Sequence, residues 1–181
     1  MNANDPLYDL KYPVGRFEWR GDSTPDERSA WIDSIAATPA RLREALDGLD
    51  DSQLDTPYRH GGWTVRQVAH HVPDSHMNAY IRFKFALTET DPLIKPYDES
   101  AWANLADTAS VPVNTSVALL DGLHLRWVAV LRSMSSGDWR RSYVHPEMGK
   151  VTLDRAAGLY AWHGRHHIAH ITGLRTRRGW I

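Results

Sequence analysis

Apolar residues recur at intervals of three and four in four separate segments of this chain, and this spacing places them on one face of an α-helix. The segments run over about 24–48, 64–88, 114–134 and 152–174. A helix with one apolar face is stable in water only when that face packs against another element. The pattern therefore predicts an all-α protein, and four long helices of this kind predict a four-helix bundle.

Helix start signals support these positions. The run Thr24–Glu27 carries a capping-box sequence with a proline at the first helical position, and Thr64 and Thr152 stand where caps of the second and fourth helices are expected. Two prolines interrupt the pattern. Pro39 should kink or divide the first helix, and Pro73 should bend the second.

The other segments are expected to be connections within one domain, residues 1–181. Residues 1–22 are rich in proline, glycine and aromatic residues, which predicts an extended arm over the body. A connection as long as 89–111 is more often functional than idle. Residues 140–153 carry a proline and a glycine that indicate a turn with a small hairpin. The last helix should end near Leu174, with three arginines after it.

Composition excludes several classes of function. The chain has no cysteine, so it cannot form disulfides, a thiolate nucleophile or a cysteine-based zinc site, and any thiol must arrive with a substrate. A net charge of −1 gives no reason to expect nucleic acid or an anionic membrane as a partner. The sequence TRRGW at 176–180 is a short basic cluster typical of a solvated helix end. No signal-like or membrane-length apolar run occurs, and we expect a cytoplasmic protein.

The last segment carries four histidines, at His163, His166, His167 and His170. At roughly 100° per residue they fall within an arc of about 100° on the face that should look into the bundle. Burying polar imidazoles costs free energy unless each finds a partner. One buried histidine is usually satisfied by a backbone carbonyl, but four on one stripe are harder to satisfy in that way. Two overlapping H-x-x-x-H pairs of this kind indicate two ligands of a metal site.

Further ligands must come from another helix. His71 lies on the apolar stripe of the second helix, whereas His70 is turned toward its flank, so His71 is the better candidate. Asp74, one turn later, is equally compatible with orienting an imidazole or bound water and with a solvated surface position. His124 in the third helix is interpreted as a core or cavity-lining residue rather than a ligand.

Three histidines without an evident fourth protein ligand are typical of a catalytic metal site, which keeps a position open for water or substrate. An open cation can polarise an oxygen or lower the pKa of a bound water or thiol. Zinc, nickel, iron and cobalt all accept imidazole, and we expect zinc or nickel. No E-x-x-H sequence occurs, which argues against a di-iron carboxylate bundle.

Four segments together resemble the YfiT-like branch of the DinB/YfiT-like superfamily. They are listed in chain order: KYPVGRFEW in the arm, WTVRQVAHHVPDSHMNAYIRFKFALTE on the second helix, IKPYDESAW in the long connection and LYAWHGRHHIAHI on the last helix. The resemblance implies an up-down-down-up four-helix bundle with one divalent metal ion per chain. It assigns the ligands to His71, His163 and His167. The doubled histidines leave a register question, because His70 could replace His71, and His166 and His170 could replace the other pair.

Members of this branch are called metal-dependent hydrolases or bacillithiol transferases. The resemblance therefore implies an enzyme, and we expect a homodimer that conjugates a low-molecular-weight thiol of the bacillithiol type to an electrophilic substrate. One alternative is a hydrolase that uses metal-activated water. Another is a non-catalytic metal-binding stress-response module, for which His170, His166 or His124 would close the site with a fourth ligand. The candidate catalytic helpers are His124, Asp74, Tyr160 and Arg82.

Overall fold

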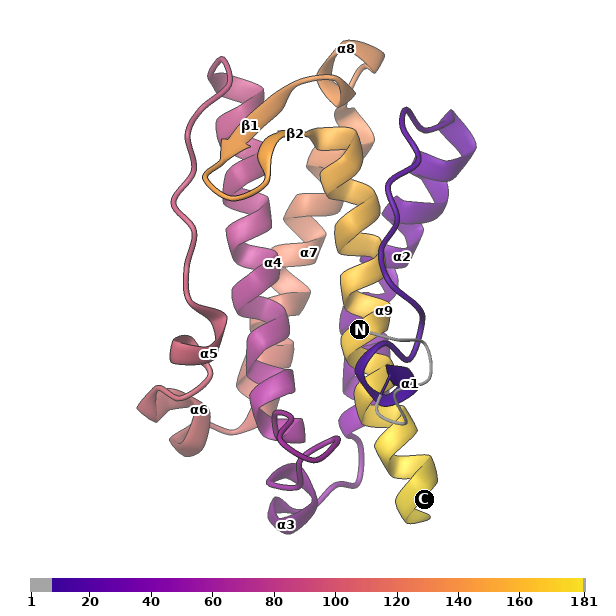
Figure 1. The fold of residues 1–181 in the computed structure, drawn as a ribbon, viewed down its shortest axis with the longest axis vertical. Helices are drawn as coiled ribbons and strands as arrows, with labels where there is room; N and C mark the ends of the chain where they lie inside the picture. The colour runs from indigo at the N-terminus through magenta and orange to yellow at the C-terminus, as the bar shows by residue number, and fades with distance from the viewer. Residues whose placement is uncertain (1–7, 181) are drawn as a thin grey trace.

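The computed structural model describes residues 8–180, so the first part of the predicted arm, residues 1–7, and residue 181 lie outside the described residues. Four long helices lie side by side along the molecule (Figure 1). They are α2 (Pro25–Leu46), α4 (Val65–Thr88), α7 (Val113–Ser133) and α9 (Leu153–Arg178). The predicted four-helix bundle is confirmed.

The order of the helices explains their directions. α2 packs against both α7 and α9, and α4 packs against the same two helices. α2 and α4 run in opposite directions, and the connection over 89–112 then returns along the whole bundle, so that α7 runs parallel to α4 (Figure 1). α9 runs back beside α2. This is the up-down-down-up order that the sequence resemblance implied.

Short elements fill the connections. The short helices are α1 (Tyr8–Lys11), α3 (Asp51–Leu54), α5 (Glu99–Trp102), α6 (Ala106–Ser110) and α8 (Ser136–Trp139). The predicted hairpin consists of β1 (Ser142–His145) and β2 (Gly149–Thr152), paired antiparallel with His145 opposite Gly149. The long connection is joined to this hairpin, because the Ile94 amide donates to the Val144 carbonyl at 3.0 Å and the Val144 amide donates to the Pro92 carbonyl at 2.9 Å.

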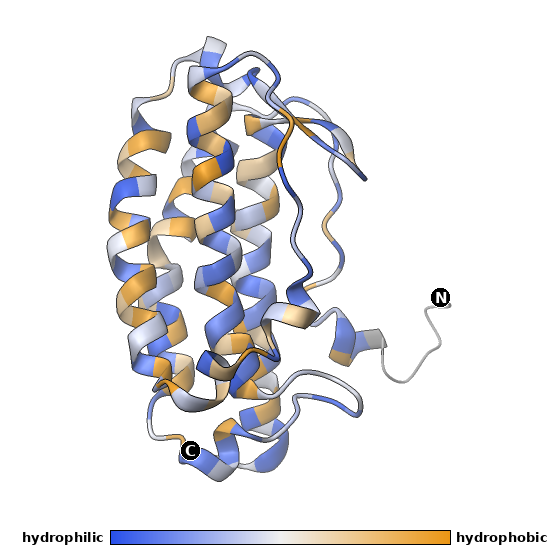
Figure 2. Cartoon of the chain, turned by 90° about the vertical axis from the view of Figure 1, so that its left-hand side faces the viewer, coloured by the Kyte–Doolittle hydropathy of each residue, from blue (hydrophilic) through white to orange (hydrophobic). Residues whose placement is uncertain are grey.

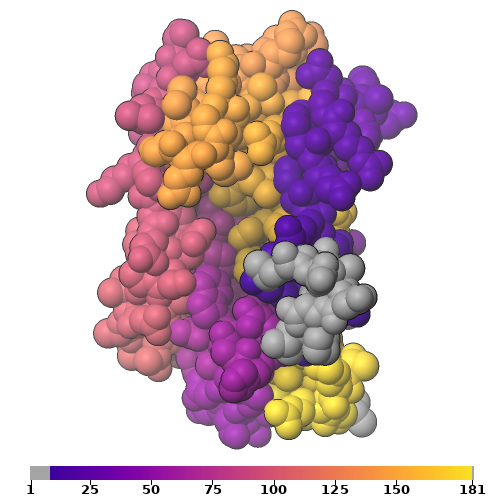
Figure 3. All heavy atoms as spheres, viewed as in Figure 1, coloured from indigo at the N-terminus to yellow at the C-terminus, as the bar shows by residue number. Residues whose placement is uncertain are grey.

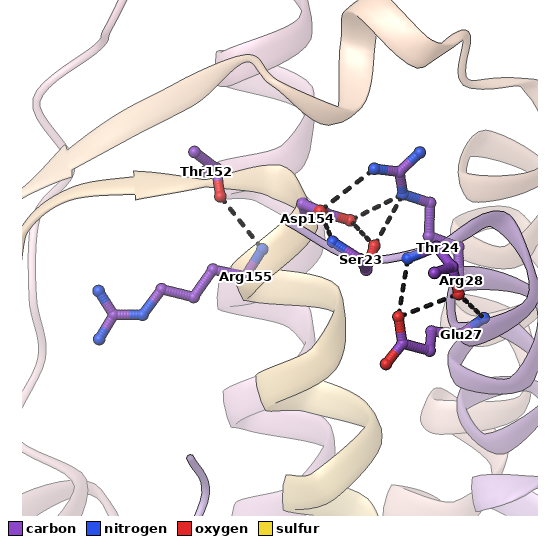
Figure 4. Close-up of polar contacts among 7 residues, drawn as sticks. All are labelled: Ser23, Thr24, Glu27, Arg28, Thr152, Asp154 and Arg155. Carbon is purple, nitrogen blue, oxygen red and sulfur yellow. Dashed lines mark hydrogen bonds and ion pairs between the residues drawn. The ribbon is translucent and has the colours of Figure 1, made fainter. Parts of the chain in front are cut away.

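The arm lies against α9 (Figure 1). In the described part of the arm, the Trp162 indole donates to the Gly15 carbonyl at 3.0 Å. Asp154, in the first turn of α9, accepts hydrogen bonds from the Ser23 amide, the Ser23 hydroxyl and the Arg28 guanidinium (Figure 4). These contacts fix the start of α2 to the start of α9.

The capping predictions are confirmed, and two helix predictions need correction. Thr24, Thr64 and Thr152 each accept a hydrogen bond from the backbone amide three residues later. Pro39 does not divide α2, which is continuous through it. α9 extends to Arg178, so the arginines predicted to follow the helix lie in its last turn. The helix ends where Gly179 adopts the left-handed φ of 65°.

Hydrophobic and hydrophilic residues alternate in bands along the long helices (Figure 2). No described helix is long and apolar enough to cross a membrane. The buried apolar side chains form two clusters. One contains Ile35, Phe83 and Trp127, and the other contains Leu42 and Leu120.

Between these two clusters, each of α4, α7 and α9 carries buried histidine. His76 lies between the two apolar groups of α4, His124 lies between those of α7, and residues 163–170 lie between those of α9. We call this band the histidine layer. Apolar packing on both sides of the layer holds its rings in defined positions.

The histidine layer is also where α2 and α9 approach each other closely, at Gly164. A Cβ at this position would stand 2.8 Å from Thr38 Oγ1 and 3.0 Å from Thr38 Cγ2, whereas a Cβ at Gly122 in α7 would meet nothing within 4 Å. We expect Gly164→Ala to lower the free energy of unfolding by about 1–3 kcal/mol through overpacking. Gly122→Ala should raise it by about 0.5–1 kcal/mol. Urea unfolding of both variants tests this, and equal effects would contradict it.

Candidate functional site

The site forms where the inner faces of α4 and α9 meet in the histidine layer. His71 lies two turns into α4, on the stripe that also buries Val68 and Val72. His163 and His167 lie one turn apart on α9, so both rings project toward the same side. Helical spacing and the contact between the two helices therefore bring distant parts of the chain together.

His71, His163 and His167 offer ring nitrogens that all lie within 4.8 Å of one another. The Nε2 atoms of His71 and His163 are 3.3 Å apart, and the Ser75 hydroxyl is 3.4 Å from His163 Nε2. Among residues 8–180, no further histidine or carboxylate joins this group. We call these residues the three-histidine group.

Burial keeps the three-histidine group neutral. It lowers the pKa of His71 to about 4, with a smaller contribution from His166. Burial also lowers the pKa values of His163 and His167 well below the usual value, and neighbouring imidazoles add to the effect. Neutral imidazole is the form that binds a metal ion.

A dense set of buried histidines should make the metal-free protein sensitive to acid. Burial lowers the pKa values of His71 and His124 to about 4, whereas histidines in the unfolded chain titrate near 6.5. Between these values the unfolded state binds more protons, so stability falls as the pH falls. Each such group contributes up to about 1.4 kcal/mol per pH unit.

We therefore expect the free energy of unfolding of the metal-free protein to drop steeply from about pH 6.5 to pH 4. Urea unfolding at several pH values across this window measures the drop. A constant stability over the window would show that the rings are not buried as neutral groups.

The structure separates the histidines whose register the sequence left open. His70 turns toward α7, where its Nδ1 lies 2.7 Å from the Ser116 hydroxyl. His166 stacks on Trp162, and His170 stacks on Tyr58. These three rings contact neighbours outside the three-histidine group, which contains the residues that the resemblance assigned.

The candidate helpers fall in different places. His124 is 2% exposed and donates from Nδ1 to the Ile35 carbonyl at 2.7 Å, as a core histidine does. Asp74 does not orient an imidazole of the three-histidine group directly, because no hydrogen bond joins its carboxylate to that group within residues 8–180. Burial raises the pKa of Asp74 to about 6, and Asp107 in α6 adds to that shift.

Tyr160 and Arg82 line a pocket of about 470 Å³ beside the three-histidine group. The pocket lies between α4, α9, the hairpin and the long connection, and its lining residues are Ser75, Arg82, Pro96, Tyr97, Asp98, Glu99, His145, Glu147 and Tyr160. In the space-filling view the hairpin and the long connection meet on this face of the molecule (Figure 3). Ser75 belongs both to the pocket wall and to the surroundings of His163 Nε2. Ser75 therefore separates the pocket from the three-histidine group by a single side chain.

Phenol groups gather around Ser75 and Arg82 at this pocket. Ser75 interacts with the phenols of Tyr97 and Tyr160, and Arg82 interacts with those of Tyr160 and Tyr143, in each case lowering the phenol pKa slightly. Burial raises the pKa values of all three phenols above the usual value, so they remain neutral donors. This network can hold an anionic or strongly polar part of a substrate beside the histidines.

Sequence reasoning did not assign a role to His76, which is fully buried in the histidine layer. Its Nδ1 lies 2.8 Å from His124 Nε2, and its Nε2 lies 3.1 Å from His163 Nδ1. Its position one turn from Val72 on the apolar stripe was the available signal. Contacts between helices, which sequence spacing does not reveal, give it its place.

The donor chemistry of the three-histidine group fits a divalent cation. Three neutral imidazoles without a described carboxylate or cation among them present electron pairs to one small region. His167 Nδ1 is buried and has no hydrogen-bond partner among the described residues. Three histidines are also an accepted protein ligand set for a catalytic zinc ion.

Comparison with known proteins shows similarity along most of the chain. The DinB superfamily profile matches residues 34–171. Two proteins named "Putative metal-dependent hydrolase", from Bacillus mycoides (strain KBAB4) and Bacillus cereus (strain B4264), are each 55% identical over 174 residues, which is 96% of this chain and 100% of each relative.

Solved structures share the fold. YfiT from Bacillus subtilis, described as "a probable metal-dependent hydrolase with an unusual four-helix bundle topology", superposes with a TM-score of 0.93 at 49% identity, covering 96% of this chain and 99% of YfiT. The four-helix bundle protein TT2238 gives a TM-score of 0.56 at 19% identity, covering 81% of this chain and 98% of that protein. The second similarity concerns the fold alone.

Proposed function

Because this chain belongs to the DinB superfamily, we propose that it is a metal-dependent enzyme whose His71, His163 and His167 hold one divalent cation, zinc or nickel. The observation that carries this proposal is the convergence of the three imidazoles, whose ring nitrogens all lie within 4.8 Å of one another. Ser75 lies between this group and the pocket, because it lines the pocket and its hydroxyl is 3.4 Å from His163 Nε2. A protein ligand set of three is typical of catalytic rather than structural sites.

We propose thiol S-transfer as the reaction. When bound, the cation would lower the pKa of a thiol and so supply a thiolate near neutral pH. The thiolate sulfur forms a bond to an electrophilic carbon, whose bond to its leaving group breaks. The thiol proton passes to solvent. The chain has no cysteine, so the sulfur comes from a small-molecule thiol of the bacillithiol type.

The pocket residues would bind and orient the two substrates. Arg82 is the cation in the pocket lining and can pair with a carboxylate of the thiol. The neutral phenols of Tyr97 and Tyr160 can donate hydrogen bonds to the leaving group. His124 and Asp74 have no substrate-binding role in this proposal, because neither lines the pocket.

Hydrolysis is the second candidate, and the names of the relatives favour it. In that reaction water replaces the thiol as the nucleophile, and the same pocket binds an ester or amide. A non-catalytic closed site is less well supported. His124 hydrogen bonds with Ile35 and His76, and His170 stacks on Tyr58, so neither is available as a fourth ligand without rearrangement.

One assay separates these functions. Metal-loaded protein is incubated with monochlorobimane and bacillithiol or cysteine, and in parallel with panels of esters and amides. We expect thioether formation with release of chloride. It should stop after chelation and in His163→Ala, but persist in His60→Ala, which removes an exposed loop histidine.

The outcomes are distinct. Hydrolysis without conjugation would replace the transferase proposal with the hydrolase. Stoichiometric metal without either activity would favour the binding module. Conjugation that continues after complete removal of the metal would overturn metal dependence.

A further inference from the structure

A continuous chain of hydrogen bonds crosses the histidine layer behind the three-histidine group. It runs from the Ile35 carbonyl to His124 Nδ1 (2.7 Å), from His124 Nε2 to His76 Nδ1 (2.8 Å), and from His76 Nε2 to His163 Nδ1 (3.1 Å). It therefore joins α2, α7, α4 and α9 in that order. We call it the histidine chain.

The starting carbonyl is available because of a proline. In an α-helix the Ile35 carbonyl would accept from the backbone N–H of residue 39, and Pro39 has none. His124 supplies the missing donor. The proline that the sequence marked as a helix breaker thus leaves an acceptor pointing into the histidine layer.

The Ile35 carbonyl determines which nitrogen donates in every hydrogen bond of the histidine chain. A carbonyl oxygen only accepts, so His124 Nδ1 must carry the proton. His124 and His76 are 2% and 0% exposed and have no carboxylate bonded to them within the described residues, so both rings are neutral. A neutral ring has one donor and one acceptor. His124 Nε2 then accepts from His76 Nδ1, and His76 Nε2 accepts from His163 Nδ1.

The last ring of the histidine chain is left with an unprotonated nitrogen, His163 Nε2. If His163 Nδ1 carries the proton, His163 Nε2 has a free electron pair, and this atom faces His71 Nε2 at 3.3 Å and the Ser75 hydroxyl at 3.4 Å. The reverse direction would place two protons on His124, a buried cation without a bonded counter-charge. Aromatic edges seal the chain, because Trp127 and Tyr160 both contact the His76 ring at nearly right angles.

We propose that His76 and His124 are positioning residues that fix the Nδ1–H tautomer of His163 and present its Nε2 lone pair to the cation site. This proposal rests on the proposed function for the cation, but the tautomer itself is a property of the metal-free protein. Outer partners of histidine ligands set ring orientation and basicity, and their loss typically costs about 10–100-fold in metal affinity. The usual outer partner is a carboxylate or a backbone carbonyl. Here it is a carbonyl acting through two further imidazoles.

The first test needs no substitution. Metal-free protein labelled with ¹⁵N-histidine is studied by NMR correlation of ring nitrogens with ring carbon-bound protons, which distinguishes the two tautomers. We expect His124, His76 and His163 all to carry the proton on Nδ1. A His163 with its proton on Nε2 would overturn the proposal, whether or not the protein binds metal.

Substitutions then test the consequence for affinity. His76→Leu should release the His163 tautomer and weaken zinc or cobalt binding by about 10–100-fold in calorimetric titration. His76→Gln keeps one donor and one acceptor on a single group, so it should restore the tautomer and most of the affinity. His70→Leu is the matched control, because it removes a buried imidazole of the same helix that lies outside the chain.

The proposal and the proposed function fail in different ways. Full metal affinity in a folded His76→Leu variant, or equal losses in His76→Leu and His70→Leu, would overturn the positioning role. A parent protein that binds no divalent cation but shows the three Nδ1–H tautomers would overturn the proposed function and leave the directed chain intact.

Discussion

Replacing His163 with alanine is expected to abolish stoichiometric binding of a divalent cation. The substitution removes one of three nitrogen donors that lie within 4.8 Å of one another. It also leaves His76 Nε2 without the ring that it contacts at 3.1 Å. The loss in affinity should exceed the roughly 10–100-fold that removal of an outer partner causes. Elemental analysis of untagged protein and calorimetric titration with zinc or nickel measure it.

His60→Ala is the control for this experiment, because it removes an exposed imidazole from a loop outside the histidine layer. The control should bind one equivalent with the affinity of the parent. Parent-like binding in His163→Ala, with circular dichroism showing an intact helical fold, would exclude His163 as a ligand.

Replacing Asp154 with alanine is expected to destabilise the fold strongly. Arg28 contacts the Asp154 carboxylate at 2.8 and 3.2 Å, and Ser23 donates both its amide and its hydroxyl (Figure 4). The side chains of Arg28 and Asp154 are only 18% and 4% exposed. Removal of one partner leaves the other charge partly buried and unpaired, which typically costs about 3–5 kcal/mol. Urea unfolding at neutral pH measures the loss.

An exposed ion pair provides the comparison. Asp33 lies 3.6 Å from Arg132, and both side chains are more than half exposed. Asp33→Ala should therefore change the free energy of unfolding by less than about 1 kcal/mol. A similar small effect of Asp154→Ala would contradict the importance of the contact between α2 and α9.

The stabilisation that Asp154 gives the fold should be lost at a lower pH than the stabilisation that depends on the neutral histidines. Burial by itself would raise the pKa of Asp154, but the hydrogen bonds from Arg28 and Ser23 outweigh it and hold the pKa below the usual value. A lowered carboxyl pKa stabilises the fold above about pH 4, and this stabilisation is lost as the pH falls through the lowered value. The loss of stability caused by protonation of the buried histidines occurs at higher pH, between about pH 6.5 and pH 4.

Local signals in the sequence predicted the helices well. The caps at Thr24, Thr64 and Thr152 depend on contacts within four residues, and the structure contains all three. The end of α9 was placed too early, because the prediction relied on the apolar stripe and did not use Gly179 as the stop. Pro39 was expected to kink or divide the first helix, and the division does not occur because packing of α2 against α7 and α9 keeps the helix continuous.

The candidate site depended on less local information. Periodicity put histidines on the inner faces of the second and last helices, but it left His163 and His167 equivalent to His166 and His170. The structure separates the pairs through partners far along the chain, such as Tyr58 against His170. Asp74 was considered for its one-turn spacing from His71, yet burial raises its pKa and Asp107, rather than a histidine, adds to that shift.

The pocket and the histidine chain lay beyond sequence reasoning. Tyr97 comes from the long connection and His145 from the hairpin. Backbone hydrogen bonds of Val144 with Ile94 and Pro92, together with the contacts of Asp91 with Ser142 and Lys150, bring these two segments together. His76 and His124 lie on different helices. Their contact depends on the register between α4 and α7, which no spacing within either helix determines.

X-ray absorption spectroscopy of protein loaded with one equivalent of zinc tests the central claim most directly, because it reports the atoms bound to the ion. We predict scattering from three imidazole rings with zinc–nitrogen distances of about 2.0–2.1 Å, together with an oxygen atom from solvent at an open position. In His163→Ala the scattering from one of the three imidazole rings should be lost. A zinc ion surrounded by oxygen atoms, or by the same imidazoles in the parent and in His163→Ala, would contradict the convergence of His71, His163 and His167 on one cation.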